Sequence, residues 1–387
     1  MPEVLKKLLF TPQKKTADPI IMGAVFILAI IGIVMIYSSS HYIAMMRESF
    51  GNNRLHFMIL QGRAALIGLF GMLVASRIDY RKLKHLILPG YLFACGLLVY
   101  ARIFSPARNN VWRWVTIGPV NFQPSEFAKV TVILLLSLFI VSRRKKEATL
   151  KNSIIELAVC GAIIATPVAL VLWGRNLSTA IIISTIGFML IFISNKYWAR
   201  FFVMGGSLVA GLLGYLFLIA RPTNHYHWDR FQLMWDPFAD PQGIGYQTVQ
   251  SLYAVASGGW FGLGLGNSNQ SRMFMPEPYN DFIFAVIAEE LGFFGAGLVL
   301  ALFALLIWRG AVTAMRAPDM FGSLIAAGAT ALIGIQVAIN VGVVTNSIPN
   351  TGVPLPFISY GGTSVVFILA LMGILLNISR HVERNTH

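Results

Sequence analysis

The sequence predicts an all-α polytopic membrane protein with ten transmembrane helices, both termini in the cytoplasm, and one long extracytoplasmic loop between spans seven and eight. Three observations support this fold class. Of the 387 residues, 56% are hydrophobic and 12% are charged, whereas a typical soluble domain carries about 25% charged residues. Ten apolar runs are long enough to cross a bilayer, and the basic residues gather on alternate sides of them. Together they exclude a soluble globular enzyme, a disordered chain and a collagen-like fibre.

The ten apolar runs are predicted to be helices because only a helix satisfies its own backbone hydrogen bonds in lipid. Each is close to the roughly 20 residues that a helix needs to cross the hydrocarbon core. The expected spans are 20–39, 57–76, 86–102, 126–142, 154–173, 178–194, 201–220, 281–307, 321–344 and 359–378. The first run follows four lysines and has no signal-peptide cleavage site, so we expect it to be an uncleaved span.

The basic residues predict the orientation. With the N-terminus inside, nineteen Lys and Arg residues fall on inner segments and six on the short outer segments, a bias that favours both termini in the cytoplasm. The net charge of +14 is attributed to this topology, and no nucleic-acid partner is expected because the basic residues form no single face. Cys95 and Cys160 lie within apolar runs and predict neither a disulfide framework nor a metal site.

We expect a single membrane domain over residues 1–387. It comprises a cytoplasmic N-terminal segment at 1–19, the large extracytoplasmic loop at 221–280 and a cytoplasmic tail at 379–387. A connection as long as 221–280 is usually functional. Because the inner loops are too short for a catalytic domain, any chemistry is expected on the outer face or within the bundle.

Charged residues inside spans are costly and are therefore candidates for function. Glu126 and Lys129 lie three residues apart at the outer start of the fourth span, a spacing that lets them pair on one helix face. The pair either fixes helix packing or, with Gln123 and Ser125 beside it, lines a polar outer cavity. Arg63 in the second span either reaches the outer head groups or provides a cation for an anionic substrate.

The densest group of polar residues surrounds Asp281, which is expected to open the eighth span directly after the long outer loop. An Asp at this position is often only a helix cap. Asp281, Ala285 and Glu289 are expected to share one helix face. Adjacent carboxylates such as Glu289 and Glu290 are expensive in a membrane unless they meet water or partners.

Three segments resemble motifs of one bacterial family. They read QPSEFAK at 123–129; GLGLGNS at 262–268, followed by PEPYNDFIF at 276–284 and EELG at 289–292; and PNTGVPLPFISYGGTS at 349–364. In this order they resemble the SEDS family, which includes FtsW, RodA and SpoVE, and the resemblance runs from the first span to the last. The second segment resembles FtsW and SpoVE more than RodA. The family often has an Asp where this sequence has Asn176, so no role is transferred to that position.

The resemblance implies a peptidoglycan glycosyltransferase of the bacterial plasma (inner) membrane, active in cell division or cell-shape maintenance. It implies polymerisation of lipid II on the outer face, with a class B penicillin-binding protein, a single-span transpeptidase, and other division or elongation membrane proteins as partners. It also implies that Asp281 is catalytic. The expected substrate-binding residues are Arg63, Gln123, Ser125, Glu126, Lys129, Glu277 and Ser359. No metal site and no cofactor are predicted, and assistance from a divalent cation stays open.

The chemistry of glycan growth agrees with this interpretation. A sugar hydroxyl must attack an anomeric carbon and expel a lipid diphosphate, and it needs a base to take its proton. Asp281 is the expected general base, and Lys129 and Arg63 are the intramembrane cations expected to stabilise the diphosphate. Two other classes stay open, namely a lipid II flippase and a scaffold for division proteins. A partner helix is expected to pack on the small residues Gly292, Gly295 and Gly297.

Overall fold

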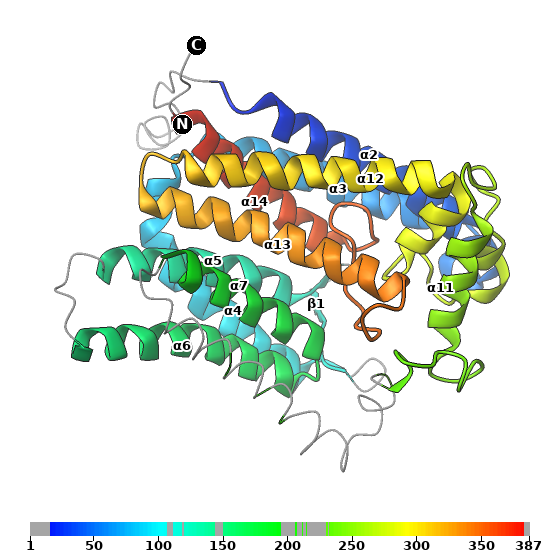
Figure 1. Cartoon of the computed structure of the whole chain (residues 1–387), viewed down its shortest axis with the longest axis horizontal. Helices are drawn as coiled ribbons and strands as arrows, with labels where there is room; N and C mark the ends of the chain where they lie inside the picture. The colour runs from blue at the N-terminus through cyan, green and yellow to red at the C-terminus, as the bar shows by residue number, and fades with distance from the viewer. Residues whose placement is uncertain are drawn as a thin grey trace.

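The computed structural model describes residues 16–106, 111–117, 120–143, 150–194 and 232–382, together with positions 206, 211, 214 and 230. It is a bundle of long, roughly aligned helices (Figure 1). The long helices are α2 (Pro19–Met46), α3 (His56–Ala75), α4 (Lys84–Phe104), α5 (Pro124–Arg143), α6 (Leu150–Trp173), α7 (Leu177–Ser194), α12 (Ile283–Met315), α13 (Met320–Val344) and α14 (Gly362–His381). The short elements are η1 (Glu48–Phe50), η2 (Tyr80–Leu83), α11 (Tyr246–Ser257) and the π-helical turn η4 (Gln270–Phe274).

In the described part of the chain, nine helices are long and apolar enough to cross a membrane. They correspond to nine of the ten predicted spans, so the prediction of a helical, multi-pass membrane protein is confirmed. Apart from the isolated positions above, the predicted seventh span at 201–220 lies outside the described residues. The predicted outer loop is not structureless, because α11 and η4 lie within it.

A cluster of polar contacts joins the first and last spans at one end of the bundle. Asp18 caps α2 by accepting a hydrogen bond from the backbone of Ile20 at 2.9 Å, and it forms an ion pair with Arg309 near the end of α12. Its own backbone N–H donates to the Ser379 hydroxyl in α14 at 3.1 Å. The start of α2 and the ends of α12 and α14 therefore lie together, opposite α11 (Figure 1).

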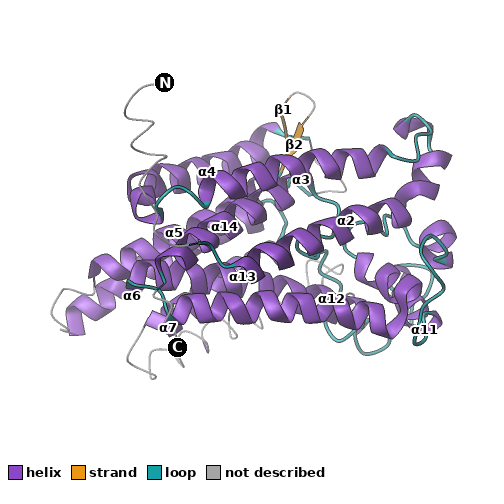
Figure 2. Ribbon diagram, turned by 90° about the horizontal axis from the view of Figure 1, so that it is seen from above, coloured by secondary structure: helices purple, strands orange, loops and turns teal. Residues whose placement is uncertain are grey.

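A small hairpin precedes α5, although the sequence was interpreted as all-helical. Strands β1 (Val115–Ile117) and β2 (Val120–Phe122) pair antiparallel, with Val115 opposite Phe122, at the edge of the bundle (Figure 2). Phe122 packs on Phe367 of α14, with 5.6 Å between ring centroids. Such short strands give no apolar run, and a search for spans therefore misses them.

Helix α12 is broken at Gly292, where φ is 68° and ψ is −169°. The residues after the break, 293–315, form about 35 Å of helix, which is enough to cross a hydrocarbon core of about 30 Å. The residues before it, 283–291, form a separate short helix whose side chains are almost all buried. The predicted span at 281–307 is present but is interrupted at Gly292, because an apolar run alone does not reveal a change of backbone direction.

The broken backbone is satisfied by residues 258–266, which we call the clasp. The carbonyls of Glu289 and Glu290, before the break, accept hydrogen bonds from the clasp residues Leu263 (2.9 Å) and Gly264 (3.0 Å). After the break, Phe293 donates to Gly259 at 2.9 Å and Phe294 donates to Trp260 at 3.2 Å. Unpaired backbone groups at membrane depth cost several kcal/mol each. The hydrogen bonds from the clasp offset that cost and allow the helix to break.

Glycine is required where the clasp meets the break. A Cβ atom on Gly292 would overlap the backbone nitrogen of Gly262 and lie 2.6 Å from the carbonyl carbon of Phe261. Gly262 has φ of +79°, and a Cβ atom there would overlap the carbonyl of Glu290. These contacts explain why glycine occupies positions 262 and 292, and they also correct the expectation that Gly292 faces a partner helix.

Candidate active site

Asp281 lies in the turn that leads into α12, two residues before the helix starts at Ile283. The N-cap of α12 is Phe282, which makes no side-chain capping bond. Asp281 therefore does not cap the helix, and the interpretation of this residue as a simple cap is wrong. It does not form part of the expected face with Ala285 and Glu289 either, because it precedes the helix.

The backbone at Asp281 is held by Asn340 of α13. The buried Asn340 side chain donates one hydrogen bond to the Asp281 carbonyl and a second to the Val353 carbonyl, both at 2.8 Å. One amide thus ties the Asp281 turn to the segment 345–361, which connects α13 and α14. Tyr279 accepts a further bond from the backbone N–H of Tyr360 at 2.9 Å. Asn340 was not among the predicted site residues, since a single amide side chain in an apolar run has no local signature in the sequence.

The segment 345–361 enters the bundle instead of passing over it. Ile358 meets α2 at Gly32, where a Cβ atom would lie 2.8 Å from the Ile358 Cα atom. Gly352 has φ of +67°, and a Cβ atom there would lie 3.1 Å from the Asp281 Oδ2 atom. The Ser359 hydroxyl accepts a bond from the backbone of Leu355 at 2.7 Å. Ser359, a predicted substrate-binding residue, is buried inside this segment and stabilises its turn.

The carboxyl group of Asp281 is partly exposed and electrostatically unusual. Within the described ranges, no group donates a hydrogen bond to it. Burial raises the pKa of Asp281 to about 6, and the positive charges of Arg113 and Arg230 oppose that rise, while Glu277 adds to it. Near neutral pH the group is therefore a carboxylate that readily accepts a proton.

Arg113 and Arg230 supply positive charge around Asp281. Neither was among the site residues predicted from the sequence. Arg230 is fixed by a hydrogen bond from its Nη1 atom to the Asn350 carbonyl at 2.8 Å, beside the segment that contacts Asp281. Arg113 lies two residues before strand β1. The two arginines and Asp281 are far apart in sequence, so only the fold brings them together.

Glu126 and Lys129 form the predicted ion pair, with 2.8 Å between Lys129 Nζ and Glu126 Oε1. Both side chains are almost fully buried, with exposed fractions of 3% and 2%. Glu126 also accepts a hydrogen bond from Ser364 of α14 at 2.9 Å, and the nearby Gln123 donates to Ser125 at 3.2 Å. The pair therefore joins α5 to α14, as the packing interpretation expected, and the polar side chains of Gln123 and Ser125 lie beside it.

Two predicted binding residues lie on the surface. Arg63 is exposed on α3, and no described contact brings it to Asp281. Glu277 is exposed at the rim of the Asp281 turn, has φ of 53°, and accepts a hydrogen bond from Asn280 at 2.8 Å. The structure thus brings Glu277 near Asp281 and leaves Arg63 apart.

Glu289 and Glu290 are buried but well partnered. Glu289 accepts hydrogen bonds from the Ser268 hydroxyl and from the backbone N–H groups of Asn269 (3.0 Å) and Gln270 (3.4 Å). Glu290 accepts from Ser38 of α2 at 2.6 Å and from the backbone of Ser268 at 3.4 Å. The two carboxylates therefore hold the segment 268–270 at the start of η4, and the expectation that they need partners is confirmed.

No group of three or more His, Cys, Asp or Glu side chains suited to a metal ion occurs in the part of the chain that the structure describes.

Comparison with known proteins gives a consistent picture. Residues 19–384 match the sequence model of the FtsW, RodA and SpoVE family, described as "Cell cycle protein". The chain is 35% identical to Stage V sporulation protein E of Bacillus subtilis (96% of this chain, 99% of the relative). It is 34% identical to Peptidoglycan glycosyltransferase MrdB of Escherichia coli (96% of this chain, 97% of the relative).

Solved structures share this fold. A chain of a peptidoglycan synthase complex, studied for its coordination of polymerization and crosslinking, superimposes with a TM-score of 0.75 at 24% identity, covering 95% of this chain and 99% of that one. The rod shape determining protein RodA of Thermus thermophilus gives a TM-score of 0.69 at 24% identity, covering 97% of this chain and 100% of that one.

Proposed function

Since this chain belongs to the FtsW, RodA and SpoVE family of cell cycle proteins, we propose that it polymerises lipid II, with Asp281 as the general base. It is a multi-pass protein of the bacterial plasma membrane and a peptidoglycan glycosyltransferase of cell division or cell shape. Lipid II as the substrate, and the roles of individual residues, are our proposal.

One observation carries the mechanism: Asp281 lies half-buried in the turn before α12, burial raises its pKa to about 6, and the charges of two arginines, Arg113 and Arg230, act on it. An acceptor sugar hydroxyl at Asp281 loses its proton to the carboxylate as it attacks the anomeric carbon of the lipid-linked donor. The bond from that carbon to the diphosphate breaks in the same displacement. A single carboxylate on the attacking side suits inversion at the anomeric carbon.

The leaving diphosphate develops negative charge, which positive groups must stabilise. We assign this role to Arg113 and Arg230, because their charges act on Asp281 and a guanidinium suits phosphate geometry. They replace Lys129 and Arg63 as the expected cations, since Lys129 is paired with Glu126 and Arg63 is exposed on α3.

The remaining predicted binding residues fall into two groups in this proposal. Gln123 and Glu277 lie at the start of α5 and at the rim of the Asp281 turn, and we propose that they contact the sugars. The buried residues act by supporting the walls of the site; they are Ser125, Glu126, Lys129 and Ser359.

The proposed topology has ten spans, both termini in the cytoplasm and the 221–280 loop outside. Helix α7 starts near Thr351, to which Ser178 donates a hydrogen bond, and runs toward the opposite end of the bundle. Arg230 donates a hydrogen bond to Asn350, the neighbour of Thr351, so the chain has returned to the end of the bundle where α7 starts. A span at 201–220 accounts for this return. A reporter inserted near Gly243 should be accessible from outside, and a cytoplasmic reporter there would overturn the proposed mechanism.

We propose a class B penicillin-binding protein as the partner, because new glycan chains need a crosslinking enzyme and the similar synthase complex coordinates polymerization with crosslinking. The decisive experiment supplies lipid II to the purified protein, with and without such a partner. Glycan chains on a gel are the expected product. Translocation of lipid II across vesicles without chain formation would support a flippase instead.

A further inference from the structure

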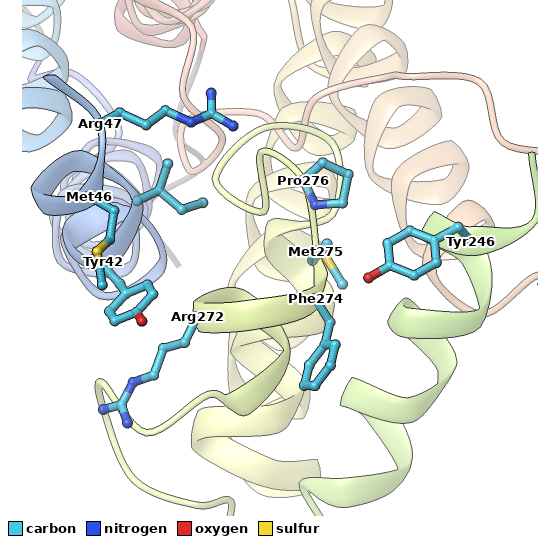
Figure 3. A pocket seen from close by; sticks show the side chains of 9 residues that line it. Tyr42, Met46, Arg47, Tyr246, Arg272, Phe274, Met275 and Pro276 are labelled. Atoms are coloured by element: carbon cyan, nitrogen blue, oxygen red, sulfur yellow. The ribbon is translucent and has the colours of Figure 1, made fainter. Parts of the chain in front are cut away.

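A groove of about 320 Å³ opens between α2, α11 and η4 (Figure 3). Its volume falls in the range of small-molecule sites. The lining residues combine two arginines and two tyrosines with an apolar surface; they are Tyr42, Ile43, Met46, Arg47, Tyr246, Arg272, Phe274, Met275 and Pro276. The mechanism above uses none of them.

The polar groups of the groove sit on separate elements. Arg47 follows the last residue of α2 and extends toward Pro276, while the Tyr246 hydroxyl points inward from α11 (Figure 3). Arg272 is fixed in η4 by bonds to the Gly266 carbonyl and, at 3.4 Å, to the Asn267 side chain. Arg47 is exposed, and no hydrogen bond or ion pair with another described residue engages its guanidinium.

This arrangement suits an anionic head group on an apolar tail. Guanidinium groups bind phosphate with well-defined geometry, and tyrosine hydroxyls add donors. Ile43, Met46 and Met275 offer the apolar surface that a lipid tail needs. Helix α2 spans the membrane and ends at this groove, so the groove lies where a lipid head group emerges.

The groove adjoins the catalytic turn. Pro276 lines it, and Asp281 follows five residues later, a stretch that cannot exceed about 18 Å. Burial raises the pKa of Tyr279, and the charge of Arg47 acts against that rise, so Arg47 is within electrostatic reach of the turn. A disaccharide-diphosphate bound here by its phosphates can extend its sugars toward Asp281.

We propose that this groove binds the diphosphate of the second lipid-linked substrate, the acceptor. The inference rests on the proposed function, because polymerisation needs two lipid-linked molecules at once. Arg113 and Arg230 hold the diphosphate that leaves, while Arg47 and Arg272 hold the diphosphate that stays on the product. Two separate sets of cations give each substrate its own place.

The test counts bound lipid II in the full-length Asp281→Asn protein by native mass spectrometry, so that turnover does not consume the ligand. Two molecules are expected per protein, and one after adding Arg47→Glu. The matched control is Arg54→Glu, an exposed arginine that bonds the Met45 sulfur and does not line the groove; it should retain two. Equal counts with Arg47→Glu and Arg54→Glu would overturn the proposal.

Kinetics give a second readout in the protein with Asp281 intact. Arg47→Glu should raise the lipid II concentration for half-maximal rate by about tenfold, equivalent to about 1.4 kcal/mol, with a smaller change in maximal rate. Tyr246→Phe, which removes one hydroxyl, should act in the same direction more weakly. A loss of maximal rate alone would assign Arg47 to the chemical step and overturn the substrate-binding role.

A competition experiment identifies whether lipid II or a membrane phospholipid supplies the phosphate that the groove binds. Lipid II should be displaced from the groove by a soluble lipid II head-group analogue and not by phosphatidylglycerol vesicles. Displacement by phosphatidylglycerol at similar concentration would mean that the groove takes membrane phospholipid. The failure of the general-base assignment is separate, because it requires glycan chains from Asp281→Asn, whatever the binding count.

Discussion

Two acidic regions lie close together in the sequence and behave differently in the fold. Glu289 and Glu290 are fully buried, and each accepts at least two hydrogen bonds, from Ser38, Ser268 and the start of η4. Asp281 is partly exposed, its carboxylate receives no hydrogen bond from the described residues, and its pKa is raised to about 6.

We interpret this difference as a structural role for Glu289 and Glu290 and a chemical role for Asp281. A buried carboxylate whose lone pairs are all used by donors holds its neighbours and has little capacity left for a substrate. A carboxylate that lacks such donors and faces cations keeps its basicity available. We expect substitutions in the first region to change the stability of the protein and substitutions in the second region to change the rate of polymerisation.

The largest expected effect belongs to Asp281→Asn. It removes the base while keeping size and shape, so polymerisation should fall by about 10²–10⁴-fold. Because the pKa of Asp281 is higher in the folded protein than the usual value of about 3.9, this carboxyl lowers stability as pH rises from about 4 to about 6. The variant should therefore be at least as stable at pH 7, measured by melting of the purified protein.

Asp281→Glu is the matched control for that variant. It restores a carboxylate but moves it by about 1 Å, and such a shift can cost around 100-fold. We expect little recovery of glycan chains. Near-normal polymer from Asp281→Asn, in an assay without another polymerase, would assign the base to another residue.

Lys129→Ala is expected to have a smaller effect on activity, and this effect arises mainly from a loss of stability. It leaves Glu126 buried without its cation, and breaking a buried pair typically costs about 3–5 kcal/mol. Membrane level and melting should fall together with activity. The double variant Glu126→Gln with Lys129→Met removes both charges and should recover stability. Full activity in the double variant would confine the pair to a packing role, whereas low activity with normal melting would restore a direct role in substrate binding.

Gly292→Ala tests the clasp. The variant combines a strained positive φ, costing about 1–3 kcal/mol, with overlap of the Gly262 backbone. It should lower melting and yield without changing the pH profile of the protein that folds. Gly297→Ala is the control, because a Cβ atom there meets nothing within 4 Å. Equal melting of the two variants would show that the clasp is dispensable.

The smallest effect is expected for the pH profile of Arg113→Gln. Arg113 lowers the pKa of Asp281 against the effect of burial, so its loss should raise that pKa further. The acid limb of the rate profile should then move to higher pH, and activity at pH 6 should fall relative to pH 8 by less than about tenfold. An unchanged ratio, compared with Arg54→Gln, would remove Arg113 from the surroundings of Asp281.

Much of the fold followed from the sequence, because long apolar runs and basic flanks are local signals. Asp281 was selected as the candidate base from its motif and stays a prediction, whereas the pairing of Glu126 with Lys129 was predicted from helical spacing and is confirmed. Arg113, Arg230 and Asn340 were missed because their roles depend on contacts between distant segments. The break at Gly292 was missed for a related reason, since its partner Gly262 is recognisable only once both backbones are in contact.

The clasp also has a consequence for biosynthesis. Residues 258–266 precede the break at Gly292 in the chain, so a ribosome delivers them to the membrane first. The helix 283–291 and the span that follows have no complete set of backbone partners until the clasp is in place, which in the proposed topology is on the outer side. Insertion of this span is therefore coupled to prior export of the loop, and a pause or mutation that delays translocation of the loop would leave the nascent span unsupported in the bilayer.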